Sequence, residues 1–94
     1  MKDDLKLFIL INGHELLGKL VSEADDLFVI EQPLGLQVVP QQDGSYGIQL
    51  VPFCSVNAEG EYNIYKHAIC SEVKKIPEDI EKAYRRQTSR IQLL

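Results

Sequence analysis

The chain has 94 residues, enough for one small domain whose core is limited by a high ratio of surface to volume. A hydrophobic content of 45% and a charged content of 26% are typical of a globular domain and exclude a disordered chain. The net charge of −4 argues against a general polyanion binder, because lysine and arginine side chains drive binding to phosphate.

The chain begins with three predicted strands, at residues 6–11, 15–22 and 27–31. The first of them is almost continuously apolar, which is typical of a strand that is buried on both faces or shared between two sheets. Asn12 and Gly13 predict a type I′ hairpin turn after it, since both residue types adopt positive φ. Gly18 permits a sharp bend within the second strand, and the acidic stretch at 23–26 predicts the turn into the third.

A long hairpin is predicted in the insert at residues 33–60. Pro33 and Gly35 are expected to interrupt the third strand, which then continues into the hairpin. Its two strands are expected at residues 36–40 and 46–53, with a tight turn at 41–45. Pro40 and Pro52 cannot donate hydrogen bonds to a sheet, so the hairpin is expected to bend or to protrude as an edge. The sequence of the insert does not indicate its role.

Two further strands are predicted at residues 61–66 and 69–75, with a tight corner at His67 and Ala68 between them. Five strands with short connections indicate a mainly β fold, namely a small and strongly bent five-stranded barrel. The whole chain, residues 1–94, is predicted to form this single domain.

A C-terminal α-helix is predicted at residues 77–89. Pro77 suits the first helical turn, and the acidic residues beside it favour the positive end of the helix dipole. Ile80, Ala83 and Tyr84 form the apolar stripe that is expected to face the barrel. The apolar residues that follow the helix are either frayed or docked on a neighbouring chain.

The basic side chains gather late in the sequence. Residues 1–60 carry three basic and nine acidic side chains, a net charge of −6, whereas residues 61–94 carry seven basic and five acidic ones, a net charge of +2. A surface that binds a polyanion is therefore expected in the C-terminal third. The acidic start of the chain and its short apolar run predict neither a signal peptide nor a membrane span, so we expect a cytoplasmic protein.

Catalysis and metal binding find little support in the sequence. Cys54 and Cys70 lack a Cys-x-x-Cys spacing, so reduced thiols are expected, with a disulfide as the alternative. A zinc site would need these cysteines together with His14 and His67, which are not paired at a zinc-site spacing. A phosphate-binding glycine loop and a nucleophile elbow are both missing. The sequence therefore predicts no enzyme, no metal and no cofactor.

Two motifs resemble those of the Sm-like proteins. The first covers residues 6–31, with an Asn-Gly turn, a glycine within the second strand and Asp26 before the third strand. The second is Tyr-Lys-His-Ala at residues 65–68, which leads into the last strand and resembles the corresponding box of the bacterial Hfq branch. The resemblance covers residues 6–31 and 61–75 and leaves out the insert and the C-terminal helix.

This resemblance implies a homo-oligomeric ring. The fourth strand, here about residues 62–66, would pair with the fifth strand of the next subunit, here about residues 69–74. Such contacts run head to tail, and they close into a ring only at a particular rotation between subunits. We expect five to seven subunits.

The resemblance also implies that the ring binds short, U-rich single-stranded RNA at its pore. Lys66 and His67 stand at the positions that reach the base and phosphate of uridine, and Phe28 stands at the position that stacks on the base. The candidate RNA-binding residues are these three with Tyr65 and Asn12.

Other interpretations stay open. Without the resemblance, Lys66 and His67 are a solvated strand end, and Phe28 is a core aromatic. Ile9 and Glu15 stand where the family's second, A-rich-binding face has an aromatic residue and a lysine, so that face is expected to be absent. The alternative function is a ring or docking module for protein partners, with contacts from the central hairpin or the C-terminal helix.

Overall fold

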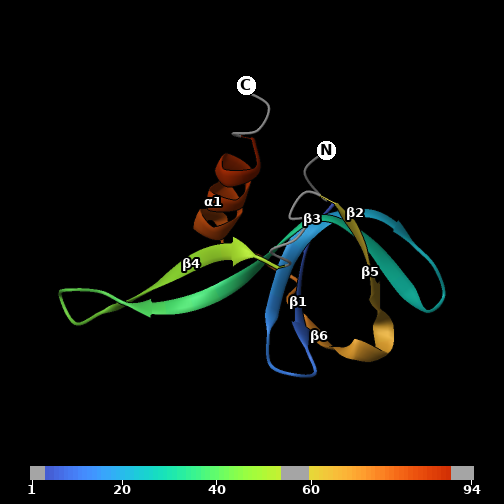
Figure 1. Ribbon diagram of the computed structural model, residues 1–94, viewed down its shortest axis with the longest axis horizontal. Helices are drawn as coiled ribbons and strands as arrows, with labels where there is room; N and C mark the ends of the chain where they lie inside the picture. Colours follow the sequence, from blue (N-terminus) through green and yellow to red (C-terminus); the bar gives the residue numbers. More distant parts are fainter. Residues whose placement is uncertain (1–3, 54–59, 90–94) are drawn as a thin grey trace.

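The computed structural model describes residues 4–53 and 60–89 as a mainly β fold with a C-terminal helix, which confirms the predicted class (Figure 1). The elements in chain order are β1 (Leu5–Leu10), β2 (Glu15–Glu23), β3 (Leu27–Pro40), β4 (Tyr46–Pro52), β5 (Glu61–Tyr65), a 3-10 turn (Lys66–Ala68), β6 (Ile69–Glu72) and α1 (Glu78–Ser89). No helix within these two described ranges is long and apolar enough to cross a membrane. Cys54 and the apolar C-terminal residues lie outside the described residues.

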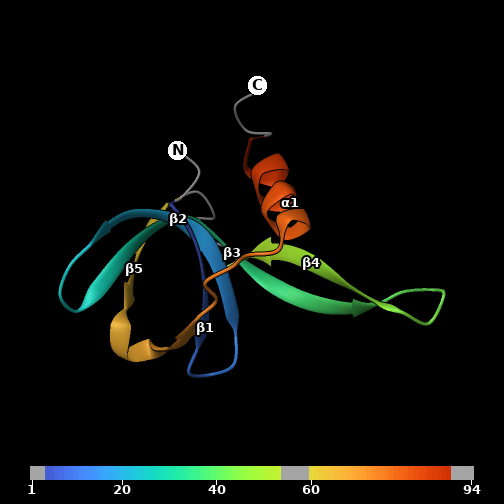
Figure 2. The same ribbon diagram turned by 180° about the vertical axis from the view of Figure 1, so that it is seen from behind.

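The strands form one antiparallel sheet in the order β4-β3-β2-β1-β6, and β5 pairs with the first part of β3. The five strands predicted for the barrel correspond to β1, β2, β3, β5 and β6, and β4 is the predicted returning strand of the long hairpin, which pairs along the second part of β3. The sheet is strongly bent, but hydrogen bonds do not close it into a barrel: among the described strands, β5 pairs with β3 and β6 pairs with β1. Figures 1 and 2 show β3 and β4 extending as a ribbon away from this bent sheet.

Strand β3 has 14 residues and joins the predicted third strand to its predicted continuation at residues 36–40, without the interruption expected at Pro33 and Gly35. Gln32 adopts a left-handed φ of 52°, which bends the strand where its neighbour changes from β5 to β4. Pro33, which has no N–H to donate, is buried next to this bend. Gly18 of β2 also lies here, and a Cβ at that position would collide with the side chain of Ile30. The close approach of β2 and β3 therefore requires a glycine at position 18, where the register of the two strands also shifts, between Leu17 and Lys19.

The turn between β1 and β2 confirms the predicted hairpin but not its predicted type. The Leu10 N–H donates to the His14 carbonyl oxygen over 2.8 Å, and Asn12 Oδ1 accepts the His14 N–H over 3.0 Å. Gly13 has a φ of 91°, whereas Asn12 is not among the described residues with positive φ. Type I′ is therefore wrong, because it requires positive φ at two residues. The turn at residues 41–45 repeats this hydrogen-bonding pattern.

The core consists of two clusters of buried side chains. The first comprises Leu5, Leu7, Leu17, Leu34, Leu50 and Tyr84, and the second comprises Phe8, Leu16, Ile30 and Ile64. Helix α1 contributes to the first cluster, whereas the second joins β1, β2, β3 and β5. Neighbouring residues of β1, such as Leu7 and Phe8, point into different clusters, so the prediction of a strand buried on both faces is confirmed.

Helix α1 covers the first cluster with the predicted apolar stripe. Ile80 and Ala83 pack against the cluster, and Tyr84 is fully buried in it. The Tyr84 hydroxyl donates to the carbonyl oxygen of Gln32 over 2.8 Å. This contact ties the helix to the bend of β3. The helix begins at Glu78, one residue later than the sequence predicts.

Tyr84 predicts a dependence of stability on alkaline pH. Burial, and next the negative charge of Glu31, raise the pKa of its phenol above the ordinary value of 10.0. The unfolded chain then loses this proton at a lower pH than the folded chain, so the free energy of unfolding is expected to fall as the pH rises above about 10. Tyr84→Phe removes this contribution, which is at most about 1.4 kcal/mol per pH unit. Urea unfolding of both proteins between about pH 9 and about pH 11 measures the difference, and equal slopes would contradict the expectation.

Candidate functional site

The residues around Lys66 form a corner between β5 and β6, which we define as residues 65–69 (Figure 1). The Lys66 N–H donates to the carbonyl oxygen of Asp26, in the turn between β2 and β3, over 2.8 Å. The Ile11 N–H, in the turn between β1 and β2, donates to the carbonyl oxygen of Ala68 over 2.9 Å. The corner is thus bonded to both turns of the first sequence motif, and the two motifs meet in space.

The ammonium group of Lys66 has two partners. Its Nζ lies 2.7 Å from Oε2 of Glu23, at the end of β2, and 5.0 Å from the centroid of the Phe28 ring, over the ring. The side chains of Lys66 and Glu23 are 34% and 51% exposed, so water reaches the ion pair. The hydrogen bond from Lys66 holds the pKa of Glu23 below its ordinary value of 4.5. The carboxylate is therefore ionised at neutral pH and balances the lysine charge.

Phe28 belongs partly to the core. Its ring centroid lies 4.9 Å from that of the buried Phe8, and the side chain packs against the second cluster. It is paired with Ile64 across β3 and β5, next to the corner. Because Lys66 lies over the ring, a base that stacks on Phe28 has to displace the lysine side chain first. The structure thus brings Phe28 and Lys66 together and gives the ring a packing role as well.

Tyr65 and His67 form a second pair at the corner. Their rings are stacked, with centroids 5.8 Å apart and an angle of 29° between the planes, and both residues are exposed. A phenol ring and an imidazole ring therefore lie one residue to either side of Lys66 in the chain. Asn12 does not belong to this group of side chains, because its Oδ1 accepts a hydrogen bond within the turn between β1 and β2.

Glu23 is the member of this group that sequence reasoning does not find. It is 43 residues from Lys66, in a stretch whose acidic residues predict only a turn. The register of the strands brings it into place, because Glu23 pairs with Phe28 and Phe28 pairs with Ile64. The sequence signal is a carboxylate at the end of a strand, and it becomes specific only when β2, β3 and β5 are aligned.

The basic residues of the C-terminal third do not form one surface. Lys82 and Arg86 belong to α1, which stands above β4 and away from the corner in both views (Figures 1 and 2). Lys82 and Arg85 also have acidic partners on the same helix, Glu78 at 3.8 Å and Glu81 at 3.1 Å. The positive charge predicted from the sequence is therefore divided between two places.

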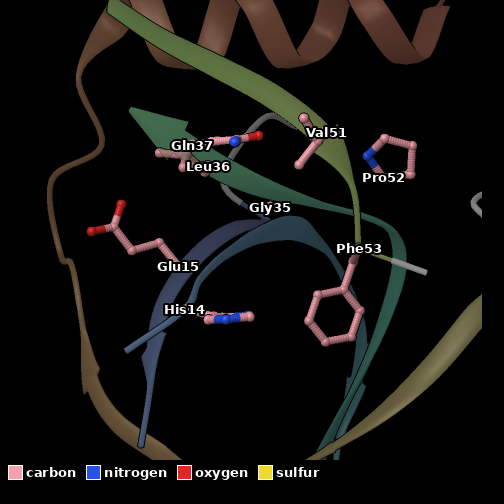
Figure 3. Close-up of a pocket in the computed structure, with 8 residues that line it drawn as sticks. All are labelled: His14, Glu15, Gly35, Leu36, Gln37, Val51, Pro52 and Phe53. Carbon is pink, nitrogen blue, oxygen red and sulfur yellow. The ribbon is translucent and has the colours of Figure 1, made fainter. Parts of the chain in front are cut away.

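A groove of about 360 Å³ lies where β2 and β3 diverge (Figure 3). It is lined by His14, Glu15, Gly35, Leu36, Gln37, Val51, Pro52 and Phe53. Figure 3 shows the rings of His14 and Phe53 bordering the same space, while the Glu15 carboxylate points to one side. One imidazole, one carboxylate and the amide of Gln37 specify no reaction, and none of the candidate RNA-binding residues lines the groove.

Residues 4–53 and 60–89 contain no group of three or more His, Cys, Asp or Glu side chains placed to hold a metal ion. Cys70 is an exposed free thiol, whereas Cys54, its possible disulfide partner, lies outside these ranges.

The search of protein-family models and the search of curated proteins found no match for the chain.

Proposed function

We propose that this chain is an Sm-like subunit that assembles through its strand edges into a ring and binds single-stranded RNA at the corner. The observation that carries the proposal is the gathering of Lys66, Phe28, Tyr65 and His67, from two separate sequence motifs, around one corner. A cation supplies a phosphate contact, aromatic rings supply base stacking, and an imidazole supplies a hydrogen bond to a base edge. These are the interactions by which proteins hold single strands.

Two strand edges beside the corner support the assembly. Because the Lys66 N–H bonds to Asp26 and strand positions alternate, the N–H of Ile64 faces β3 while those of Asn63 and Tyr65 face outward. Among the described strands, β5 has no neighbour beyond β3, and β6 has none beyond β1. Pairing β5 of one subunit with β6 of the next satisfies both edges, and repetition of this contact gives the ring of five to seven subunits.

The ring compensates for the weakness of one corner. A single exposed lysine contributes little affinity, but several linked copies bind one strand with an avidity that exceeds each contact by orders of magnitude. The net charge of −4 does not prevent this, because salt screens charges that lie more than about 10 Å away. U-rich single strands are the substrate that the resemblance favours.

Binding of labelled oligo-U and oligo-A tests this function, at two salt concentrations and with the assembly state measured by light scattering. We expect salt-sensitive binding that prefers oligo-U. The double substitution Lys66→Ala with His67→Ala is expected to weaken it at least about tenfold and to leave the oligomer intact, since it removes phosphate and base contacts from every subunit.

A matched variant controls for the loss of positive charge. Lys82→Ala removes the same positive charge from α1, away from the corner (Figure 1). This control is expected to bind oligo-U as the unmodified protein does. An intact oligomer that binds neither oligonucleotide, even at low salt, would rule out the RNA-binding function.

A protein-docking module is the second candidate, and the ribbon of β3 and β4 favours it. Val38, Tyr46 and Ile48 on the ribbon are 64%, 73% and 52% exposed. Asp43 is the only charged residue in the sequence from 32 to 53. An apolar and nearly uncharged ribbon is typical of a surface that another chain covers. For such a module, the corner substitutions leave partner binding unchanged.

A further inference from the structure

The carboxylate of Glu23 is paired with the ammonium group of Lys66, which RNA is proposed to contact. Its Oε2 lies 2.7 Å from Lys66 Nζ, while the same ammonium group lies 5.0 Å from the Phe28 ring. The carboxylate comes from the end of β2 and the ring from the start of β3, in register with each other. We call these three residues the Glu23–Lys66–Phe28 cluster. In this cluster, an anionic side chain of the protein is already paired with the lysine.

We propose that Glu23 is an affinity-setting residue whose carboxylate holds the position of an RNA phosphate on Lys66, so that RNA binds by displacing it. The inference rests on the proposed function and adds to it Glu23, a residue that does not itself contact RNA. Carboxylate and phosphate oxygens are both anionic acceptors for an ammonium group, and they compete for it.

The exposure of the pair makes the displacement feasible. The Lys66 and Glu23 side chains are 34% and 51% exposed, and an ion pair in contact with water contributes little to stability. A phosphate can therefore take the place of the carboxylate at small cost. A buried pair would instead resist exchange, since separating it leaves an unpaired charge away from water.

Displacement also prepares the aromatic ring. In the structure, the ammonium group of Lys66 lies over the Phe28 ring and is also paired with the Glu23 carboxylate. When the lysine follows a phosphate away from Glu23, the ring face beneath it becomes available for a base. Phosphate binding and base stacking are thus coupled through a single side-chain movement, and Glu23 opposes both.

Neither Asp26 nor Lys6 takes the place of Glu23 in the pair with Lys66. Asp26 contacts Lys66 through its backbone carbonyl, which accepts the Lys66 N–H, and not through its carboxylate. Lys6 contributes a smaller electrostatic effect on Glu23 and is itself paired with Glu72 at 3.2 Å. Among the described residues, Glu23 is therefore the side chain whose removal frees Lys66 most directly.

Glu23→Gln tests the inference by titration of labelled oligo-U into the assembled protein. Removal of the competing charge is expected to tighten binding about twofold to fivefold per site, the range for one exposed ion pair. The salt dependence is expected to steepen by about 0.7 in the slope of log affinity against log salt, because one more uncompensated cation faces the strand. The proposal predicts both changes together.

Two further variants separate this effect from a general change in charge. Glu78→Gln also removes one carboxylate from an exposed lysine, Lys82 at 3.8 Å, but does so on α1, and it is expected to leave affinity unchanged. In the Lys66→Met background, Glu23→Gln is expected to give no gain, because the lysine through which it acts is missing. A gain that persists without Lys66, or that Glu78→Gln reproduces, overturns the inference.

The remaining outcomes distinguish the inference from the function on which it rests. If the unmodified protein binds oligo-U and Glu23→Gln binds with equal or lower affinity, Glu23 is not a competitor, and RNA binding at the corner still stands. A lower affinity would show that Glu23 positions Lys66 for the strand. If neither protein binds, the RNA-binding function and the inference fail together.

Discussion

Asn63→Pro is expected to leave the subunit folded and to abolish its assembly. The N–H of Asn63 points away from β3, on the edge that the proposed ring pairs with β6 of the next subunit. Proline has no N–H to donate, and edge strands accept it where the N–H faces outward. The substitution therefore removes a contact between subunits without removing one within the sheet.

Light scattering measures the oligomer and circular dichroism measures the fold. Ile64→Pro is the matched comparison, because the N–H of Ile64 faces β3 and its side chain is buried in the second cluster, so this change is expected to unfold the subunit. Loss of the ring is also expected to lower the affinity for oligo-U by orders of magnitude, since each corner then binds alone. A normal oligomer of Asn63→Pro would show that β5 is not the assembling edge.

Tyr84→Ala is expected to lower the free energy of unfolding by about 3 to 5 kcal/mol, the cost of removing a large aromatic side chain from a core. Tyr84 is fully buried among residues of β1, β2, β3 and β4, and its hydroxyl bonds to Gln32 at the bend of β3. Because a small domain has a total stability of about 5 to 15 kcal/mol, this loss is a large part of the whole.

Unfolding in urea measures the effect of Tyr84→Ala, and Tyr84→Phe separates its two parts. The phenylalanine variant keeps most of the buried ring and loses only the hydrogen bond to Gln32, so a decrease of about 0.5 to 1.5 kcal/mol is expected. A decrease of less than about 1 kcal/mol for Tyr84→Ala would contradict the packing of α1 on the sheet, since an exposed helix residue costs little to truncate.

The elements that the sequence predicts well depend on residues close to one another along the chain. The Asn-Gly turn at Gly13, the apolar run of β1 and the stripe of Ile80, Ala83 and Tyr84 each appear in the structure where the sequence predicts them. Side-chain alternation, glycine conformation and helical periodicity are properties of neighbouring residues, so a single sequence contains them. The prediction of type I′ failed because the Asn12 side chain holds a turn in which glycine alone adopts positive φ.

The fold could not be predicted where one strand serves two neighbours. Pro33 and Gly35 predict a break in β3, yet the strand continues because Gln32 takes the left-handed conformation and Tyr84, 52 residues away, bonds its carbonyl oxygen. The first part of β3 pairs with β5, and pairing between segments so distant along the chain leaves no mark in a local pattern.

For the candidate site, the sequence by itself determined the residue types and the two motifs that carry them, including Lys66, His67 and Phe28. It did so because a motif is a local arrangement of residues. The tertiary structure decided that Glu23 meets Lys66, that Lys66 lies over Phe28, and that the basic side chains of α1 stand apart from the corner. Those relations follow from strand register and from hydrogen bonds between segments far apart in the chain, and they exist only once the sheet has formed.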